Sequence, residues 1–330
     1  FRLLFRLIFL LFFPAFIYEA KFWVSPVFKL LGGFFPNAIS GLSIRWGMAR
    51  TAGTFEHPIL ACIMIVIVYR LHRWLTWCGV WEQPQPGLMG WLQRHSRRFP
   101  IALRYQISIV LILMSLMTIS RGPWIGALVG AALVATGNVK DRKQALYVFI
   151  AVFLVFGVGA QSALDAYITP KEGEMLSESA QTMMYRKVMI DQYKEFLFER
   201  VWTGWGLTTV PTIQGMESVD NAFFLMALQH GVLAPVIFIC IFLYAIASQL
   251  SFGIKAPPGD FPLGFTFSGI YLACFISFST VYMGAQTEPM LFLLLGWGEG
   301  IKRRRYEREV GNAASQRPAQ ERPAFRNVIR

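Results

Sequence analysis

Charged residues are scarce in this sequence. Only 15% of its 330 residues are Asp, Glu, Lys or Arg, whereas 55% are hydrophobic. Soluble globular domains carry about 25% charged residues, so an ordinary soluble domain is excluded. The apolar excess falls in runs of roughly 18 residues or more, the length that a helix needs to cross a bilayer core of about 30 Å. Because lipid offers no partner to open backbone groups, the sequence predicts an all-α, polytopic membrane protein.

Cysteine is equally sparse. Cys62, Cys78, Cys240 and Cys274 are scattered, and three of them lie inside apolar runs, so the sequence shows neither a disulfide framework nor a metal-ligand spacing. The chain opens with Phe1, and its first apolar run has no small-residue cleavage signature. We interpret that run as a membrane span and not as a signal peptide. A start without Met is also compatible with a fragment that lacks earlier spans.

Apolar windows predict about eight transmembrane helices. The sixth is longer than a bilayer needs and contains Pro235, so we expect it to kink there or to begin outside the membrane. We expect one transmembrane domain at 1–305 and a basic, largely disordered cytoplasmic tail at 306–330. The predicted spans are 3–18, 55–71, 102–119, 122–138, 144–163, 220–248, 262–282 and 289–301.

Charge on alternate loops predicts the orientation. If the N-terminus is cytoplasmic, the inner segments hold 21 of the 31 Lys and Arg residues but 7 of the 19 acids. Cytoplasmic loops retain positive charge, so this topology is self-consistent for a bacterial inner membrane. It also explains the basic stretches at 94–98 and 302–305 as stop-transfer charge, which argues against nucleic-acid binding. The outer, periplasmic segments would be 19–54, a tight turn at 120–122 and the long loop 164–219.

Arg121 lies in the tight outer turn. One interpretation is an arginine that snorkels at a helix end. The outer side disfavours positive charge, however, and Gly122, Gly126 and Gly130 follow at a four-residue spacing. Small residues at that spacing let a neighbouring helix approach closely. We therefore expect Arg121 to sit at a tightly packed site.

The long outer loop contains a predicted amphipathic helix from Met184 to Trp202. Most of its charged residues lie off an apolar stripe, so we expect the helix to lie on the membrane surface or over a cavity. Arg186 is either an ordinary residue of the charged face or a functional one. A Gly-x-Gly pair at 204–206 ends the helix. The stripe consists of Tyr185, Met189, Tyr193 and Phe196.

Asp220 immediately precedes the sixth predicted span, in the sequence Ser218-Val219-Asp220-Asn221. Either Asp220 or Ser218 can cap that helix. An aspartate at the mouth of a membrane helix is also a candidate general base, and the two roles are compatible.

The first outer loop leads into the second span through three further candidates. His57, followed by Pro58, fits a helix start. Arg45 and Arg50 lie where the topology favours neutral residues, so they are candidates for binding a polyanion. Arginine makes bidentate contacts with phosphate oxygens, which makes a diphosphate at the lipid surface the natural ligand.

Together these stretches resemble the O-antigen ligase and polymerase superfamily of bacterial membrane proteins. The Ser-Arg-Gly-Pro-Trp-Ile-Gly stretch at 120–126 is similar to the family's turn between two spans. The run 185–206 resembles its long periplasmic loop, and 220–231 resembles its helix entry with a glycine one helix-length later. The resemblance covers roughly 45–300.

The resemblance implies a membrane-integral glycosyltransferase of GT-C-like architecture. It further implies a polyprenyl diphosphate-linked glycan as donor, a glycan acceptor, no cofactor, no metal, and other polysaccharide assembly proteins as partners. Ligases of the family usually carry His before the Asn, whereas this chain has Asp220. That substitution resembles the polymerase and exopolysaccharide branches.

We therefore hypothesise that the protein polymerises an O-antigen or exopolysaccharide, by transferring glycan from its polyprenyl diphosphate carrier to a lipid-linked acceptor. Two alternatives stay open. One is a ligase that moves the finished glycan to a lipid A core or a protein. The other is a transporter or flippase of an anionic lipid or solute, although the predicted spans carry almost no polar residues near their centres.

The same hypothesis assigns roles to the candidate residues. Arg121 and Arg186 would stabilise the charge that develops on the leaving diphosphate. Asp220 would take the proton of the acceptor hydroxyl. Substrate-binding support would come from Arg45, Arg50, His57 and Asn221, the last of which would orient the aspartate.

Overall fold

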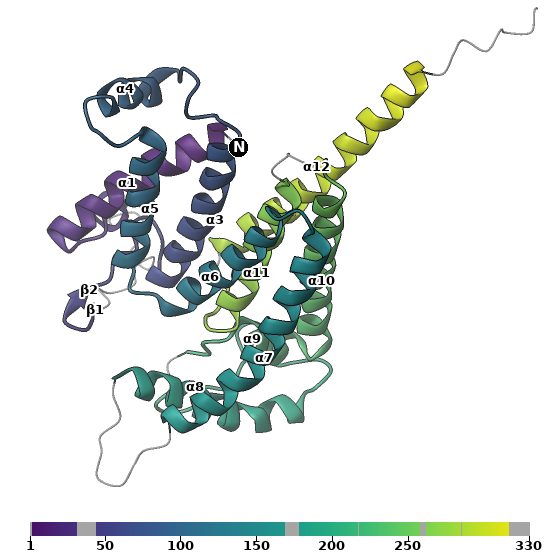
Figure 1. Ribbon diagram of the computed structural model, residues 1–330. Coiled ribbons are helices and arrows are strands. Elements are labelled where there is room, and N and C mark those ends of the chain that lie inside the picture. Colours follow the sequence, from purple (N-terminus) through teal and green to yellow (C-terminus); the bar gives the residue numbers. More distant parts are fainter. Residues whose placement is uncertain are drawn as a thin grey trace, which may run out of the picture. The chain divides into compact units, whose positions relative to one another are not determined.

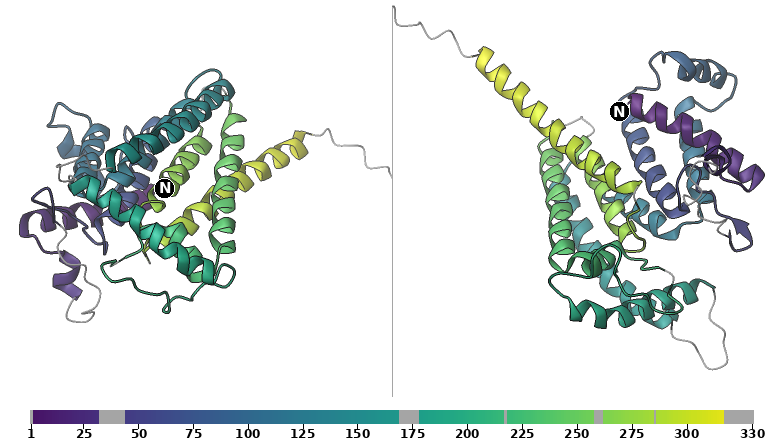
Figure 2. Two further views of the ribbon diagram at one scale, coloured as in Figure 1. Left: turned by 90° about the horizontal axis from the view of Figure 1, so that it is seen from below. Right: turned by 180° about the vertical axis from the view of Figure 1, so that it is seen from behind.

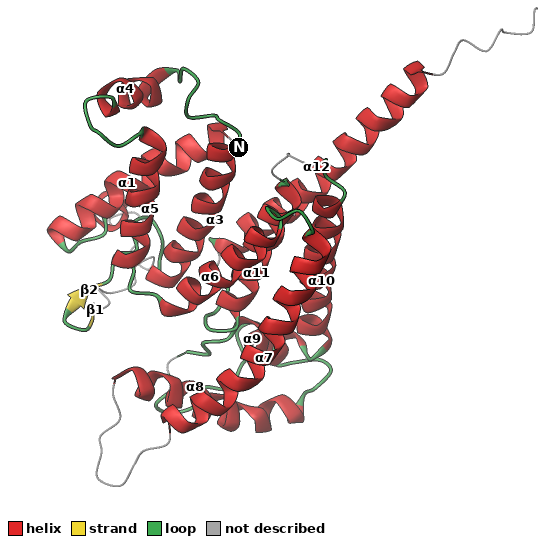
Figure 3. Ribbon diagram, viewed as in Figure 1, coloured by secondary structure: helices red, strands yellow, loops and turns green. Residues whose placement is uncertain are grey.

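The computed structural model shows a predominantly helical protein with one two-stranded hairpin in its described residues (Figures 1 and 3). The chain divides into two compact units, Phe1–Glu288 and Pro289–Arg330. The described residues are 2–31, 44–168, 178–216, 218–257, 262–284 and 286–316.

Every predicted span contains a helix, which confirms the helical prediction. Among the described helices, α3 and α10 are long and apolar enough to cross a membrane, and α5 and α11 are apolar but shorter. The helices of the first unit are α1 (Arg2–Phe22), α2 (Pro26–Leu31), α3 (Pro58–Trp77), α4 (Gly87–Ser96), α5 (Leu103–Met117), α6 (Arg121–Thr136), α7 (Arg142–Ile168), α8 (Glu178–Glu199), α9 (Ala222–His230), α10 (Leu233–Ile254) and α11 (Leu263–Phe278).

The second unit contains most of α12 (Thr287–Gln316). Its surface carries i,i+3 and i,i+4 ion pairs, Lys302–Glu299 at 2.6 Å and Arg303–Glu307 at 2.9 Å. Such pairs each stabilise a helix by about 0.2–0.5 kcal/mol. The stretch 306–316 is therefore helical where the sequence suggested a disordered tail, and 317–330 lies outside the described residues.

The sixth predicted span is two helices and not one. The chain breaks between α9 and α10 at Gly231, whose φ is +83°, and not at Pro235. The break accommodates a backbone that docks there: Val232 N donates to Val201 O at 2.8 Å, and Trp205 N donates to Leu228 O at 2.7 Å. The break could not be predicted from the sequence, because the residues that these bonds join lie far apart along the chain.

The apolar stripe of α8 packs against protein, and other residues of the helix line a pocket, which fits the expectation of a helix over a cavity. Met189 and Tyr193 are buried and pack with Val219 and Leu228. In Figure 1 and the right-hand view of Figure 2, α8 lies across one end of the neighbouring helices. Phe198 and Trp202, near the end of α8, are apolar side chains of this region that are 67% and 71% exposed.

The segments predicted to face outward meet at one end of the first unit. Thr51 N donates to Met117 O at 3.1 Å, which joins the first outer loop to the end of α5. Ala222 N donates to Val281 O at 3.0 Å, which joins the entry of α9 to the segment after α11. Residues from separate parts of the chain are thereby brought together at this end.

Close packing of α6 on α11 forms the core of this arrangement. A Cβ added at Gly126 would lie 2.6 Å from Ala273 O, and one at Gly130 would collide with the carbonyl oxygen of Gly269. The glycine spacing therefore serves the close helix approach predicted from the sequence, and the neighbour is α11.

Gly130→Val should lower the thermal unfolding midpoint of the detergent-purified protein. Overpacking of a tight contact costs about 1–3 kcal/mol, and here the obstacle is backbone, which yields less readily than a side chain. Gly157→Val on α7 is the matched control, because an added Cβ there meets no described atom within 4 Å. Equal midpoints for the two variants would contradict the packing account.

Candidate functional site

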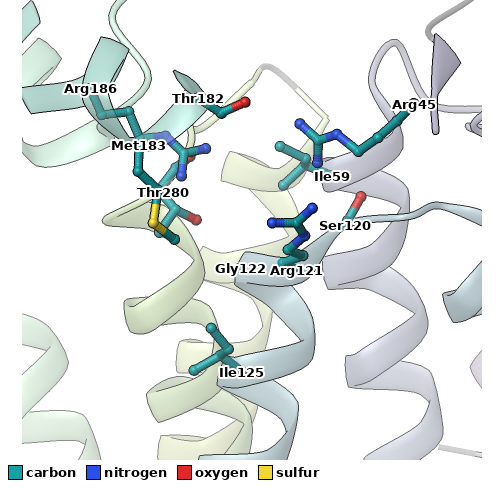
Figure 4. Close-up of a pocket in the computed structure, with 10 residues that line it drawn as sticks. All are labelled: Arg45, Ile59, Ser120, Arg121, Gly122, Ile125, Thr182, Met183, Arg186 and Thr280. Carbon is teal, nitrogen blue, oxygen red and sulfur yellow. The ribbon is translucent and has the colours of Figure 1, made fainter. Parts of the chain in front are cut away.

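One pocket lies where these outward segments meet. Its cavity volume is about 80 Å³, and it is partly open to solvent. In Figure 4 the guanidinium groups of Arg45, Arg121 and Arg186 point toward the same space. The lining residues are Arg45, Ile59, Ser120, Arg121, Gly122, Ile125, Thr182, Met183, Arg186 and Thr280.

A short hairpin positions two of the arginines. Strands β1 (Ile44–Arg45) and β2 (Met48–Ala49) pair antiparallel, and the turn between them has positive φ at both Trp46 and Gly47. The Arg45 Nη1 donates to Ile119 O at 3.3 Å. The Arg121 guanidinium lies over the Trp46 ring, 4.6 Å from its centroid, in a cation–π contact.

Arg50 lies behind the pocket wall and not in it. Its guanidinium is buried, with Nε donating to Thr118 O and Nη2 to Ser120 Oγ, each at 3.0 Å. Burial and the charge of Arg45 lower its pKa to about 10, which still leaves it protonated. The turn that it holds includes Ile119, a non-glycine residue at φ +47°. Arg50 therefore positions the turn that begins α6.

Arg186 reaches the pocket from α8. Its Nη2 donates to Thr280 O at 3.0 Å. Burial and the charge of Arg45 lower its pKa, and the charge of Asp220 opposes that shift. Within the described part of the chain, no carboxylate forms an ion pair with Arg186 and no acceptor meets its Nε. A partly buried cation without a paired carboxylate is a candidate site for an anionic ligand.

Asn221, and neither Asp220 nor Ser218, caps the following helix. Its Oδ1 accepts a hydrogen bond from Phe224 N at 3.0 Å. Asp220 instead accepts from Ser218 Oγ at 2.7 Å and stays half-buried. Because its neighbour satisfies the helix end, the Asp220 carboxylate is available for chemistry. It does not line the pocket, but its charge acts on both Arg186 and His57.

His57 caps α3, as the helix-start interpretation predicted. Its Nδ1 accepts from Ile59 N at 3.2 Å, and Pro58 follows as the first helical residue. Burial and the charge of Arg50 lower the pKa of His57 to about 4, so the ring is neutral near pH 7. The accepting Nδ1 leaves the proton of the neutral ring on Nε2.

Sequence reasoning missed the segment that follows α11. Thr280 and Tyr282 fell inside the predicted span 262–282, yet α11 ends at Phe278 and this segment borders the pocket. The Tyr282 hydroxyl donates to Glu56 Oε1 at 3.1 Å. The polar sequence Ser-Thr at 279–280 was the available signal of a helix end.

Comparison with known proteins adds a family to this geometry. Residues 106–239 match the family model described as O-antigen ligase. This match supports the O-antigen ligase-like superfamily. No curated protein and no solved structure matches the chain. The family match and the apolar helices suggest a membrane protein with a role in polysaccharide assembly, as a ligase or a polymerase acting on lipid-linked glycans.

The matched segment includes Arg121, Arg186 and Asp220. Arg45 and Thr280, which complete the pocket, lie on either side of it. In the residues that the structure describes, no group of three or more His, Cys, Asp or Glu side chains is placed to hold a metal ion. The positive charge of the pocket comes from arginines.

The neutral state of His57 predicts a pH dependence of stability. Its folded pKa of about 4 lies below the ordinary value of 6.5, so the unfolded chain binds a proton first as the pH falls. Stability should therefore decrease between about pH 6.5 and pH 4. His57→Asn keeps a capping acceptor but does not titrate, so its melting midpoint should fall less over that interval. Parallel pH profiles for the two proteins would refute the assignment.

Proposed function

We propose that this protein polymerises a surface polysaccharide, an O-antigen or exopolysaccharide, on a polyprenyl diphosphate carrier. The observation that carries the proposal is the convergence of Arg45, Arg121 and Arg186 on one pocket from three separate elements. Like charges that share a site repel, and the lowered pKa of Arg186 reflects this together with burial. A diphosphate is the ligand that would relieve the repulsion, because guanidinium groups match phosphate oxygens in charge and geometry.

The proposed reaction is a transfer of glycan between two lipid carriers. The acceptor hydroxyl oxygen attacks the anomeric carbon of the donor sugar, and the bond from that carbon to the phosphate oxygen breaks. Its electron pair leaves with the polyprenyl diphosphate, whose developing charge Arg121 and Arg186 stabilise. The hydroxyl proton passes to the Asp220 carboxylate. Atoms and charge balance with no further reactant.

The structure supports Asp220 as the base in two ways. Asn221 performs the capping role, so the carboxylate is not consumed by the helix end. Ser218 donates to one carboxylate oxygen, which fixes the group and leaves its other oxygen for a proton. The charge of Asp220 acts on Arg186, consistent with a base beside the diphosphate site.

A substrate on a polyprenyl carrier also has to reach the pocket from the lipid. On α6, Ile125 and Leu128 continue the face that begins with Arg121, and they are 53% and 72% exposed. The pocket therefore adjoins an apolar surface within the first unit. We propose the polytopic topology of eight spans in a bacterial inner membrane, with the pocket at the periplasmic face, because the segments with less positive charge gather at the pocket.

The acceptor distinguishes polymerase from ligase. Asp220 in place of the family's usual His favours the polymerase. Purified protein supplied with lipid-linked repeat units should produce longer lipid-linked chains. Transfer only to a lipid A core or a protein would make it a ligase instead, and solute uptake without any change in glycan would indicate a transporter.

Arg121→Ala and Arg186→Ala should each reduce chain extension about 10²- to 10³-fold, the usual cost of removing one donor to a developing charge. Both variants should still insert in the membrane. Chain length on gels and the amount of membrane protein measure the two effects. Arg200→Ala is the matched control, because Arg200 lies over Trp205, 4.2 Å from the ring centroid, and does not line the pocket. Normal polymer from both pocket variants would sink the assignment.

Asp220→Asn should lower kcat about 10²- to 10⁴-fold, the range for loss of a general base, with little change in KM. The amide keeps the shape and the hydrogen bond from Ser218 but cannot take a proton. Single-turnover extension of lipid-linked acceptor measures the chemical step. Asp191→Asn, an exposed acid on α8, is the control. A kcat within twofold of wild type would show that another group takes the proton.

A further inference from the structure

A carboxylate and a tyrosine hydroxyl form a second polar group beside the arginine pocket. Tyr282 Oη donates to Glu56 Oε1 at 3.1 Å. Each residue lies close along the chain to a lining residue of the pocket, Glu56 to Ile59 and Tyr282 to Thr280. The pair therefore belongs to the two segments, the entry of α3 and the segment after α11, that supply Ile59 and Thr280 to the pocket wall.

Anchoring of that segment does not require the Glu56 carboxylate. Gln286 Oε1 accepts from the backbone N of Glu56 at 3.1 Å, and Gln286 Nε2 donates to Thr54 O at 3.2 Å. These two bonds already tie the segment to the loop before α3. Within the described residues, no basic side chain forms an ion pair with Glu56. A half-buried carboxylate beside a cationic pocket thus neutralises none of its arginines.

Aromatic surface and neutral donors surround this carboxylate. The rings of His57 and Tyr282 meet edge to face, with centroids 6.4 Å apart. His57 is neutral near pH 7, and burial together with the charges of Glu56 and Asp220 raises the pKa of Tyr282 to about 12. Both side chains therefore keep their protons: the Tyr282 hydroxyl donates its proton to Glu56 and can still accept a hydrogen bond, and His57 carries its proton on Nε2.

We propose that Glu56 and Tyr282 form the subsite for the acceptor glycan, where they hydrogen-bond its hydroxyl groups. The inference rests on the proposed function for the identity of its ligand. Sugars are uncharged and rich in hydroxyls, so they are recognised by carboxylate acceptors, by neutral donors and by aromatic faces. The charged side chains of the arginine pocket are hydrogen-bond donors only. The arginine pocket thus suits the donor diphosphate, and the Glu56–Tyr282 pair suits the acceptor glycan.

The position of Asp220 favours the acceptor glycan as the ligand of this pair. The base has to contact the acceptor hydroxyl, because that is the proton it removes. Ala222 N donates to Val281 O at 3.0 Å, which brings the segment that contains Asp220 alongside the segment that contains Tyr282. A glycan bound to Glu56 and Tyr282 would be held next to the carboxylate that activates it.

The test uses Glu56→Gln and Tyr282→Phe in the full chain. The probe is free acceptor oligosaccharide, released from its lipid carrier, titrated against detergent-purified protein. Each variant should bind it about tenfold more weakly or worse, since a hydrogen bond to a charged group is involved. In elongation assays the KM for the lipid-linked acceptor should rise by a similar factor, with the donor KM within twofold of wild type.

Matched controls keep the result specific. Glu195→Gln and Tyr306→Phe make the same chemical changes at exposed positions outside the pair and should bind the oligosaccharide as wild type does. The melting midpoints of Glu56→Gln and Tyr282→Phe should stay unchanged. Wild-type glycan binding and acceptor KM in both variants would overturn the inference, as would binding losses that appear only together with a lower melting midpoint.

Failure of the proposed function gives a different pattern. Activity retained in Arg121→Ala and Arg186→Ala would reject the diphosphate site, while the oligosaccharide titration would still report on Glu56 and Tyr282. Arginine-dependent elongation with unaltered glycan binding in Glu56→Gln and Tyr282→Phe would reject the acceptor subsite alone. No binding of the oligosaccharide by the wild-type protein would also reject it.

Discussion

The close contact between α6 and α11 is the constraint on which the site depends. At Gly122 an added Cβ would collide with the Thr280 side chain. The first turn of α6 therefore packs closely against the segment that follows α11. The backbone carbonyl oxygen of Thr280 in turn accepts a hydrogen bond from Arg186 Nη2. The packing of two apolar helices thereby sets the separation of Arg121 and Arg186. A looser interface would move the two cations apart and leave the pocket without its shape.

A second constraint is the cost of holding cations together outside bulk water. Arg50 meets this cost with carbonyl and hydroxyl acceptors, and it is committed to the turn that it supports. Arg186 has one carbonyl acceptor and, in the described chain, no ion-paired carboxylate. The two arginines thus differ in their acceptors: Arg50 is committed to the turn, whereas Arg186 is the one that we propose for ligand binding. Burial alone does not separate these roles, but the acceptors do.

The sequence predicted the parts of the fold that depend on local pattern. Apolar length located the helices, and the glycine spacing after Arg121 indicated the tight helix contact. It could not identify α11 as the partner, because the partner's backbone carbonyls leave no mark in the sequence. For the same reason it placed Arg50 among the ligand-binding residues and the helix cap on Asp220 or Ser218. Those roles depend on the acceptors at Thr118 and on the one-residue offset that gives the cap to Asn221.

Only part of the proposed site lies within the segment that the family model matches. Arg121, Arg186 and Asp220 lie inside the matched segment, whereas Glu56 and Tyr282 lie outside it on either side. The chemistry of glycan transfer is common to any substrate carried on a diphosphate, so its groups belong with the shared segment. Recognition of a particular acceptor depends on the arrangement of its hydroxyls, which differs from one polysaccharide to another. Groups that bind the acceptor are therefore expected outside the matched segment. The loop before α3 and the segment after α11, which carry Glu56 and Tyr282, both lie outside it.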